Sequence, residues 1–348
     1  MVDEVRFREL ISGKRRGFVA VLLRIFLRLL SWGYRFAIFA RNKAYDFDLK
    51  KSQRANAKVI SVGNLTTGGT GKTPLVAFLS DDLKQRNIAH AILSRGYRSL
   101  DDDSNDEKLM LDKFCPGVPH LQNPNRVSSA QTAVEEHGAK VLILDDGFQH
   151  RRLQRDLDIV LIDAINPWGY GTVLPRGLLR EPISALQRAD LVVVTRADFC
   201  DKKQLEQIEL QIGAVSNEIP IVKIGFPPRS LVNAAGEKKE LSEFAGSKIL
   251  ACCGIGHPEG FRKTLSLANL KPVSFEVYPD HHRYTEDDWK HLQTIANQKE
   301  ASVLLTTMKD LVKLEQFETE SLPIWAVEIG VEFLAGEETL KKLLAKIP

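Results

Sequence analysis

The sequence has 348 residues, 43% of them hydrophobic and 27% charged, which is typical of a soluble globular protein and argues against long disordered arms. The net charge of +3 is too small to indicate a nucleic-acid partner. The four cysteines form no CxxC pair that could hold zinc, and they fit buried thiols in a reducing compartment. The length suggests two domains.

The first notable segment, residues 14–42, is strongly apolar but is interrupted by Arg24, Arg28 and Arg35. Its longest uncharged piece is far shorter than the ~20 residues that a membrane span needs. On a helix these arginines fall within about 40° of one another. A basic stripe on an apolar helix predicts contact with an anionic membrane surface. The alternative is a helix packed on its own domain, with the arginines along its edge.

The stretch 59–79 has the order of a phosphate-binding loop: an apolar β-branched strand, a glycine-rich loop, Lys72-Thr73 and a helical pattern. Glycines bring backbone N–H groups against phosphate oxygens, and the following helix adds its positive end. Lys72 is expected to reach the β- and γ-phosphates of ATP, and Thr73 to ligate Mg²⁺. The general pattern has glycine where this chain has Thr66. The predicted nucleotide-binding residues are Thr66, Thr67, Gly68, Gly69, Thr70, Gly71, Lys72 and Thr73.

A second nucleotide-binding signal is the apolar run 141–144, which ends in Asp145 and Asp146. A buried strand that ends in carboxylates typically places an acid beside the Mg²⁺ held by the phosphate-loop threonine. Further strands are predicted at 89–93, 159–162 and 191–194. Strands that alternate with helical patterns predict a mostly parallel sheet with helices on both faces.

The loop 166–182 is rich in Gly and Pro and follows a strand, which is where α/β sheets bind their ligands. The tetrad at 195–198, Thr-Arg-Ala-Asp, lies where related proteins read the base with Asn-Lys-x-Asp. It lacks the Asn and the Lys, so guanine specificity is not supported.

The second half predicts a smaller α/β domain. Pro227, Pro228 and a Gly-containing turn interrupt the pattern and favour a hairpin linker. A loop with His281 and His282 precedes a helix capped by Thr285; by itself such a pair is most often surface decoration. The predicted parts are an N-terminal amphipathic helix (1–45), a P-loop core (46–220), a hairpin linker (221–245) and a C-terminal α/β domain (246–348).

Several motifs together resemble the tetraacyldisaccharide 4′-kinase family, the lipid A kinases of Gram-negative bacteria. They are GNLTTGGTGKTP, SRGY, LDDGFQHRRLQRDLDIVLIDA, LPRGLLREP, ACCGIGHPEGF, DHHRYT and TMKDLVKL. The resemblance implies a two-domain P-loop kinase that uses ATP and Mg²⁺. It also implies a peripheral position on the cytoplasmic face of the inner membrane. The acceptor would be the 4′-hydroxyl of an acylated glucosamine disaccharide 1-phosphate.

The resemblance also assigns roles to individual residues. The family's catalytic aspartate and histidine match Asp106 and His281, with His282 as the alternative histidine. The acids near the metal match three carboxylates: Asp145, Asp146 and Glu181. Residues near substrate or phosphate match Arg95, Tyr97, Glu107, Arg126, His150 and Arg180.

Phosphoryl transfer needs charge neutralisation and in-line positioning, which Lys72 and Mg²⁺ are suited to supply. A sugar hydroxyl also needs a base, for which we expect Asp106, oriented by His281. We expect Asp106 in the first domain and His281 in the second, so that domain closure assembles the pair. Two other readings stay open from the residues alone: a membrane-associated nucleotide switch, and a soluble sugar kinase with another acceptor. We expect a monomer.

Overall fold

The computed structural model describes residues 2–96, 106–280, 282–317 and 322–347. The chain forms two compact units, and each is described by itself. The first contains residues 1–95, 118–225 and 333–348, and the second contains residues 96–117 and 226–332.

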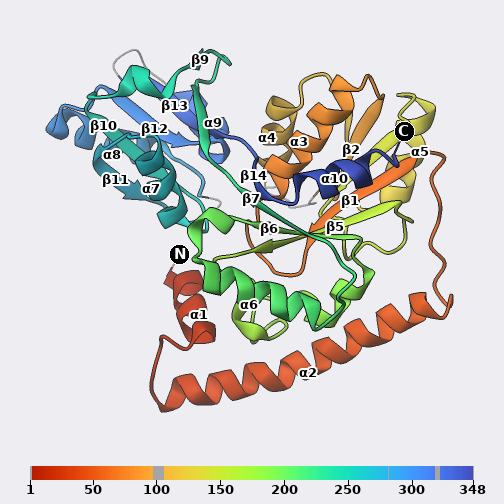
Figure 1. The fold of residues 1–348 in the computed structure, drawn as a ribbon. Helices are drawn as coiled ribbons and strands as arrows, with labels where there is room; N and C mark the ends of the chain where they lie inside the picture. Colours follow the sequence, from red (N-terminus) through yellow and green to blue (C-terminus); the bar gives the residue numbers. More distant parts are fainter. Residues whose placement is uncertain (1, 97–105, 281, 318–321, 348) are drawn as a thin grey trace. The chain divides into compact units, whose positions relative to one another are not determined.

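The first unit is built on an eight-stranded sheet (Figure 1). In spatial order its strands are β14 (Glu332–Ala335), β7 (Ile221–Gly225), β6 (Leu191–Thr195), β5 (Leu157–Asp163), β1 (Lys58–Asn64), β4 (Val141–Asp145), β2 (His90–Ser94) and β3 (His120–Gln122). From β7 to β3 every pairing is parallel. The central strands are continuous Val, Ile and Leu runs and are buried, as a sheet covered on both faces requires.

The helices of this unit are α1 (Val2–Ser12), α2 (Phe18–Asp46), α3 (Lys72–Gln85), α5 (Arg126–Glu135), α6 (Lys202–Gly213) and α10 (Glu337–Leu344). Helices lie on both faces of its sheet. On one face, Ile208 and Ile212 of α6 pack against Val160 and Val192 of the sheet. Figure 1 shows α3 and α10 on the other side. The fold is the P-loop type of α/β sheet that the sequence predicts.

The second unit has a six-stranded sheet of its own. Its order is β11 (Pro272–Val277), β10 (Ile249–Cys253), β12 (Val303–Thr307), β13 (Ile324–Ile329), β8 (Pro228–Val232) and β9 (Lys238–Lys239). The first four strands are parallel to one another. Strand β8 pairs antiparallel with β13, and β9 pairs antiparallel with β8. The helices of this unit are α4 (Asp106–Phe114), α7 (Pro258–Leu267), α8 (Glu286–Lys299) and α9 (Met308–Leu314). Short 3-10 turns elsewhere span Gly169–Gly171, Ile183–Arg188, Ala197–Phe199, Leu241–Phe244 and Glu315–Phe317.

The composition of the two units differs from the predicted ranges. The part predicted separately as 1–45 belongs to the first unit. The segment with α4 belongs to the second unit, where Met110 and Phe114 pack against its core. The last residues return to the first unit, where Arg86 donates to the carbonyl of Ile347 at 2.6 Å. The predicted hairpin forms as β8 and β9, but it makes the edge of the second sheet rather than a separate linker.

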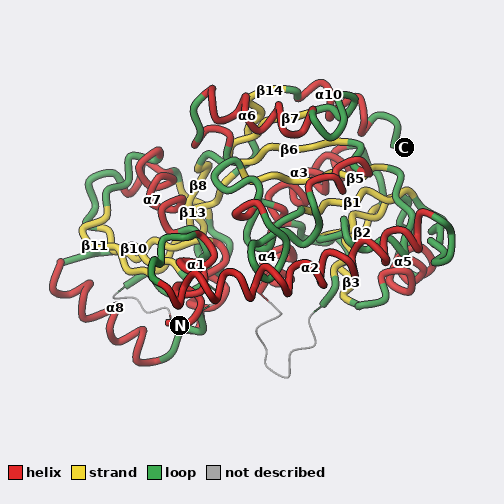
Figure 2. Tube along the Cα trace, turned by 90° about the horizontal axis from the view of Figure 1, so that it is seen from below, coloured by secondary structure: helices red, strands yellow, loops and turns green. Residues whose placement is uncertain are grey.

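Helix α2 runs along the outside of the first unit (Figures 1 and 2). A narrow stripe of it, including Ala20, Ser31 and Ile38, is buried against the protein. The opposite face carries exposed large apolar side chains, among them Phe18, Leu22, Ile25, Phe26, Leu29, Trp32, Phe36 and Phe39. In the described part of the chain, no helix combines the length and apolarity needed to cross a bilayer.

Candidate active site

The glycine-rich loop after β1 has the backbone that phosphate binding needs. Gly68 has φ +116°, and Gly71, the N-cap of α3, has φ +85°. A side chain would strain the backbone at both positions. Lys72 and Thr73 open α3, so the positive end of the helix faces the loop.

Side chains from two strands hold the carbonyl groups of this loop. Asn64, at the end of β1, donates to the Thr66 carbonyl at 2.8 Å. Thr195, at the end of β6, donates through its buried hydroxyl to the Thr70 carbonyl at 2.8 Å. Arg196 donates to the Gly69 carbonyl at 2.8 Å. With these carbonyls bound to the protein, the loop is fixed before any phosphate arrives, which lowers the cost of binding.

The carboxylates predicted after β4 lie beside the loop. Asp146 has a left-handed backbone, with φ +53°. Its carboxylate lies 3.4 Å from Lys72 Nζ and accepts from Arg180 Nη1 at 2.9 and 2.7 Å. Burial alone would raise the pKa of Asp146, but the charges of Lys72 and Arg180 outweigh it and lower the pKa to about 2. Asp146 is therefore an anion at neutral pH, and Asp145 beside it is buried.

The donor set of this corner fits Mg²⁺. The Thr73 hydroxyl and the carboxylates of Asp145 and Asp146 are the hard oxygen ligands that this ion prefers. Among the described residues no cluster of three or more His, Cys, Asp or Glu forms a metal site. A kinase magnesium needs fewer, because one or two carboxylates suffice when phosphates and water complete the shell.

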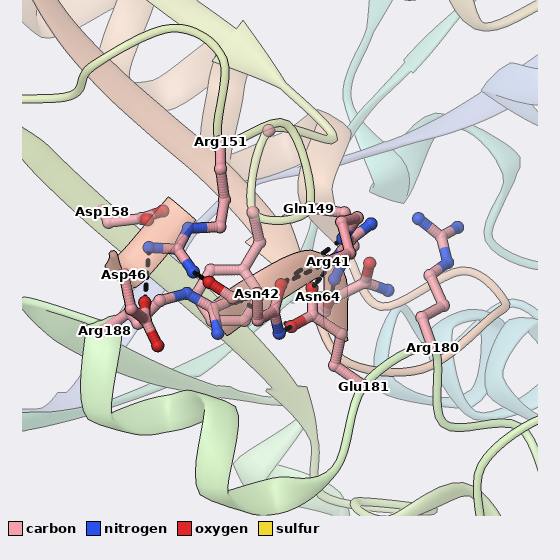
Figure 3. A network of polar contacts seen from close by, with 12 residues as sticks. Arg41, Asn42, Asp46, Asn64, Gln149, Arg151, Asp158, Arg180, Glu181 and Arg188 are labelled. Atoms are coloured by element: carbon pink, nitrogen blue, oxygen red, sulfur yellow. Dashed lines mark hydrogen bonds and ion pairs between the residues drawn. The ribbon is translucent and has the colours of Figure 1, made fainter. Parts of the chain in front are cut away.

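Glu181 has a different environment from the other two acids (Figure 3). Its side chain is fully buried. One oxygen accepts from Arg41 at 3.0 Å, and the other accepts from Asn42 at 2.8 Å and Arg188 at 2.9 Å. Both oxygens are engaged within the protein, so these contacts favour a positioning role over the metal role that the family resemblance implies.

Positive charge gathers around His150 in the same unit. Burial and the nearby charges of four arginines lower the pKa of His150 to about 4. The arginines are Arg126, Arg155, Arg152 and Arg95, in decreasing order of effect. The imidazole is therefore neutral at pH 7 inside a cationic region, and its buried Nε2 atom makes no hydrogen bond to the described protein. Arg126 is itself 5% exposed. Such a region suits an anionic ligand group.

Of the predicted catalytic pair, Asp106 is the first residue of α4. The predicted substrate residue Glu107 is the second residue of the same helix. His281, and Tyr97 among the predicted substrate residues, lie outside the described residues. Because α4 belongs to the second unit, Asp106 and the loop around position 281 are in one unit. The expectation that the pair is divided between two domains is therefore wrong.

Sequence reasoning gave no role to α9, although its residues hold the loop that flanks position 281. Lys309 pairs with Asp280 at 2.7 Å, and Lys313 donates to the carbonyl of His282 at 3.2 Å. His282 also contacts Asp288 at 3.0 Å and stacks on Tyr278 with ring centroids 4.7 Å apart. With these contacts His282 is held in place within the second unit. The TMKDLVKL stretch is the signal from which this support could have been found.

Two further residues escaped sequence reasoning. The sequence relates Thr195 and Arg196 only to base reading, whereas the structure joins them to the phosphate loop. Arg196 also pairs with Asp163 at 2.6 Å. The signal available was the position of Thr195-Arg196 at the end of a parallel strand, the edge where α/β sheets bind ligands.

Comparison with known proteins is consistent with this geometry. Residues 23–348 match the family described as tetraacyldisaccharide-1-P 4′-kinase. A tetraacyldisaccharide 4′-kinase of Syntrophus aciditrophicus is 41% identical, with 89% of this chain and 88% of the relative covered. One of Halothermothrix orenii is 32% identical, with coverage of 97% and 96%. A crystal structure of LpxK from Aquifex aeolicus in complex with ATP has a TM-score of 0.75 and 31% identity, covering 93% of this chain and 99% of that one. The chain therefore belongs to the tetraacyldisaccharide 4′-kinase family, a family of ATP-dependent kinases.

Proposed function

We propose that this kinase transfers the γ-phosphoryl group of ATP to the 4′-hydroxyl of tetraacyldisaccharide 1-phosphate, giving lipid IVA in lipid A biosynthesis. The observation that carries the nucleotide half is the phosphate loop, with Lys72 and Asp146 beside it. Family membership carries the identity of the acceptor.

The phosphate side of the reaction uses the first unit. Backbone N–H groups of residues 66–73 bind phosphate oxygens, and Lys72 neutralises charge that develops on the transferred group. Thr73, Asp145 and Asp146 would hold Mg²⁺, which screens the phosphate charge when bound. Arg180 keeps Asp146 ionised and oriented through its two short contacts.

The proposed removal of the hydroxyl proton uses Asp106 and His281. Asp106 takes the proton of the 4′-hydroxyl as the new P–O bond forms, and His281 orients Asp106. Asp106 and the residues on either side of position 281 belong to the second unit, and the phosphate loop belongs to the first. Exclusion of water during that step would limit wasteful hydrolysis of ATP.

The cationic region around His150 is our proposed site for the anionic part of the acceptor. Arg95 and Arg126 bring charge, and neutral His150 adds a hydrogen-bonding nitrogen. We also propose that Tyr97 and Glu107 bind the phosphate-accepting lipid.

Helix α2 supports a peripheral position on the cytoplasmic face of the inner membrane. Trp32 is 64% exposed and Phe36 is 71% exposed, an arrangement that costs free energy in water and gains it at a headgroup–acyl boundary. The Arg24 side chain donates to the Arg15 carbonyl at 2.8 Å. Arg24 is therefore bound within the protein, and we do not assign it to the membrane-binding stripe. Arg28 and Arg35 are exposed at the edge of the apolar face, where anionic lipids can bind them. We propose Mg²⁺ as the ion, an anionic membrane surface as partner, and a monomer.

The membrane proposal is tested with vesicles of anionic lipid. Arg28→Glu with Arg35→Glu should move the protein into the supernatant, and Lys202→Glu, an exposed cation on α6, should not. If the double variant still sediments with vesicles at low salt, the basic edge does not hold the enzyme at the surface.

The catalytic proposal is tested by a transfer assay with γ-radiolabelled ATP and tetraacyldisaccharide 1-phosphate in detergent. Label should appear in the lipid, and ATP consumption should depend on the acceptor. ATP turnover that ignores the acceptor would favour a nucleotide switch instead.

A further inference from the structure

One connection between helix α2 and the phosphate loop is the segment of residues 173–181, which contacts both. At one end of the segment, the Ser31 hydroxyl accepts from the Arg176 amide at 3.0 Å. Its single proton is shared between the Val173 carbonyl at 3.0 Å and the Leu27 carbonyl of its own helix at 2.9 Å. At the other end, the Tyr34 hydroxyl donates to the Arg180 carbonyl at 3.2 Å. Helix α2 therefore holds this segment at several points along its length.

The same segment also lies against the phosphate loop. The Thr67 amide donates to the Leu178 carbonyl at 2.8 Å, and the Arg180 amide donates to the Leu65 carbonyl at 2.6 Å. These backbone bonds fix the position of Arg180 relative to the start of the loop. A shift of the segment would therefore move Arg180 with it.

Two adjacent side chains in this segment contact different parts of the first unit. Figure 3 shows Glu181 extending toward Asn42, and Arg180 extending away from it. The Glu181 carboxylate accepts hydrogen bonds from Arg41 and Asn42 of α2, while the Arg180 guanidinium donates to the Asp146 carboxylate. One peptide unit thus separates a contact with the membrane-facing helix from a contact with the acid at the phosphate loop.

The burial of Glu181 makes this connection stiff. A fully buried carboxylate is tolerated only when its oxygens are paired, and here three donors pair them. Loss of one donor leaves part of the charge uncompensated, so the side chain and its backbone must shift to find another partner. The Arg41 guanidinium is one-third exposed, which makes it the donor that can be removed with least damage to the core.

We propose that Glu181 is a positioning residue that couples helix α2 to Arg180 and Asp146, so that the helix seated on the membrane also fixes the acid at the phosphate loop. This inference rests on the proposed kinase reaction. It goes beyond it by giving α2 a part in the chemical step, in addition to a part in attachment.

The test compares Arg41→Ala with Lys43→Ala in the full-length enzyme. Both variants remove one positive charge from the last turns of α2, but Lys43 pairs with Asp46 rather than with Glu181. Arg41→Ala should lower kcat roughly 10- to 100-fold, the scale of a misplacement near 1 Å. The KM for ATP, sedimentation with anionic vesicles and cooperative melting should stay close to wild type. Arg41→Lys should restore much of kcat, because an ammonium group can still pair with Glu181. Lys43→Ala should behave as wild type.

A second variant guards against a purely structural loss. Tyr34→Phe removes only the hydroxyl that binds the Arg180 carbonyl, and it should also lower kcat more than it changes the KM for ATP. If Arg41→Ala and Tyr34→Phe melt at lower temperature but keep wild-type kcat, Glu181 only stabilises the fold and the coupling is refuted. If the wild-type enzyme itself transfers no phosphate to the acceptor, the proposed function fails first, and the two failures are distinct.

Discussion

Replacing Thr195 with valine should loosen the phosphate loop while leaving the rest of the molecule in place. The Thr195 hydroxyl is fully buried and donates to the Thr70 carbonyl at 2.8 Å, and Thr70 is itself buried. Valine has nearly the same volume, so no cavity forms, but the carbonyl loses its donor. An unsatisfied buried carbonyl costs about 1–3 kcal/mol.

If about 1–2 kcal/mol of that cost falls on the ATP-binding form of the loop, the Kd for ATP should rise roughly 5- to 30-fold. Calorimetric titration with ATP measures this directly, and a melting curve of the same sample reports the fold. Thr264→Val is the matched control, because the Thr264 hydroxyl donates to the Gly260 carbonyl in α7 of the second unit. A Thr195→Val protein that binds ATP with wild-type affinity would refute the idea that β6 fixes the loop in advance.

Three further predictions follow from individual contacts. Lys72→Ala should lower kcat by several orders of magnitude at an unchanged melting temperature, because the principal cation beside the transferred phosphate is lost; near-normal turnover in a folded variant contradicts the assignment. Lys309→Ala should lower kcat and spare the Kd for ATP, because it removes the pair with Asp280 in the second unit; Lys290→Ala, an exposed lysine on α8, is the control, and equal losses in both variants would argue against a role for α9. The folded-state pKa of His150 lies below its unfolded value, so folding is opposed once the unfolded chain binds the proton. Stability should therefore fall as pH drops from about 6.5 to about 4, and His150→Gln should remove part of that slope in denaturant titrations at several pH values; an unchanged slope means that other groups carry it.

The features that were predictable from the sequence alone are those specified by short continuous stretches of residues. The phosphate loop needs glycine at Gly71, where φ is +85°, and an apolar strand before it, so a short stretch specifies both. The strand ending in Asp145 and Asp146 was confirmed for the same reason. Alternating strands and helices predicted a parallel sheet, which the register confirms.

The features that sequence missed depend on contacts between distant residues. Arg196 reaches the Gly69 carbonyl across 127 positions, and Arg41 reaches Glu181 across 140. No local pattern predicts that Glu181 is buried and paired with Arg41. Helix α4 follows a strand of the first unit in sequence, yet Met110 and Phe114 bury their apolar groups in the core of the second. The side on which a helix packs is decided by tertiary contacts rather than by its own pattern.

The proposed transfer step is tested most directly by a double-mutant comparison of Asp106→Ala and His281→Ala in the radiolabel transfer assay. If Asp106 takes the proton and His281 orients it, each single variant should lose most of kcat. The double variant should then lose little beyond the worse single variant, with the KM for ATP nearly constant throughout. Losses that simply multiply in the double variant would show that the two residues act independently. Wild-type kcat in either single variant would place the base elsewhere.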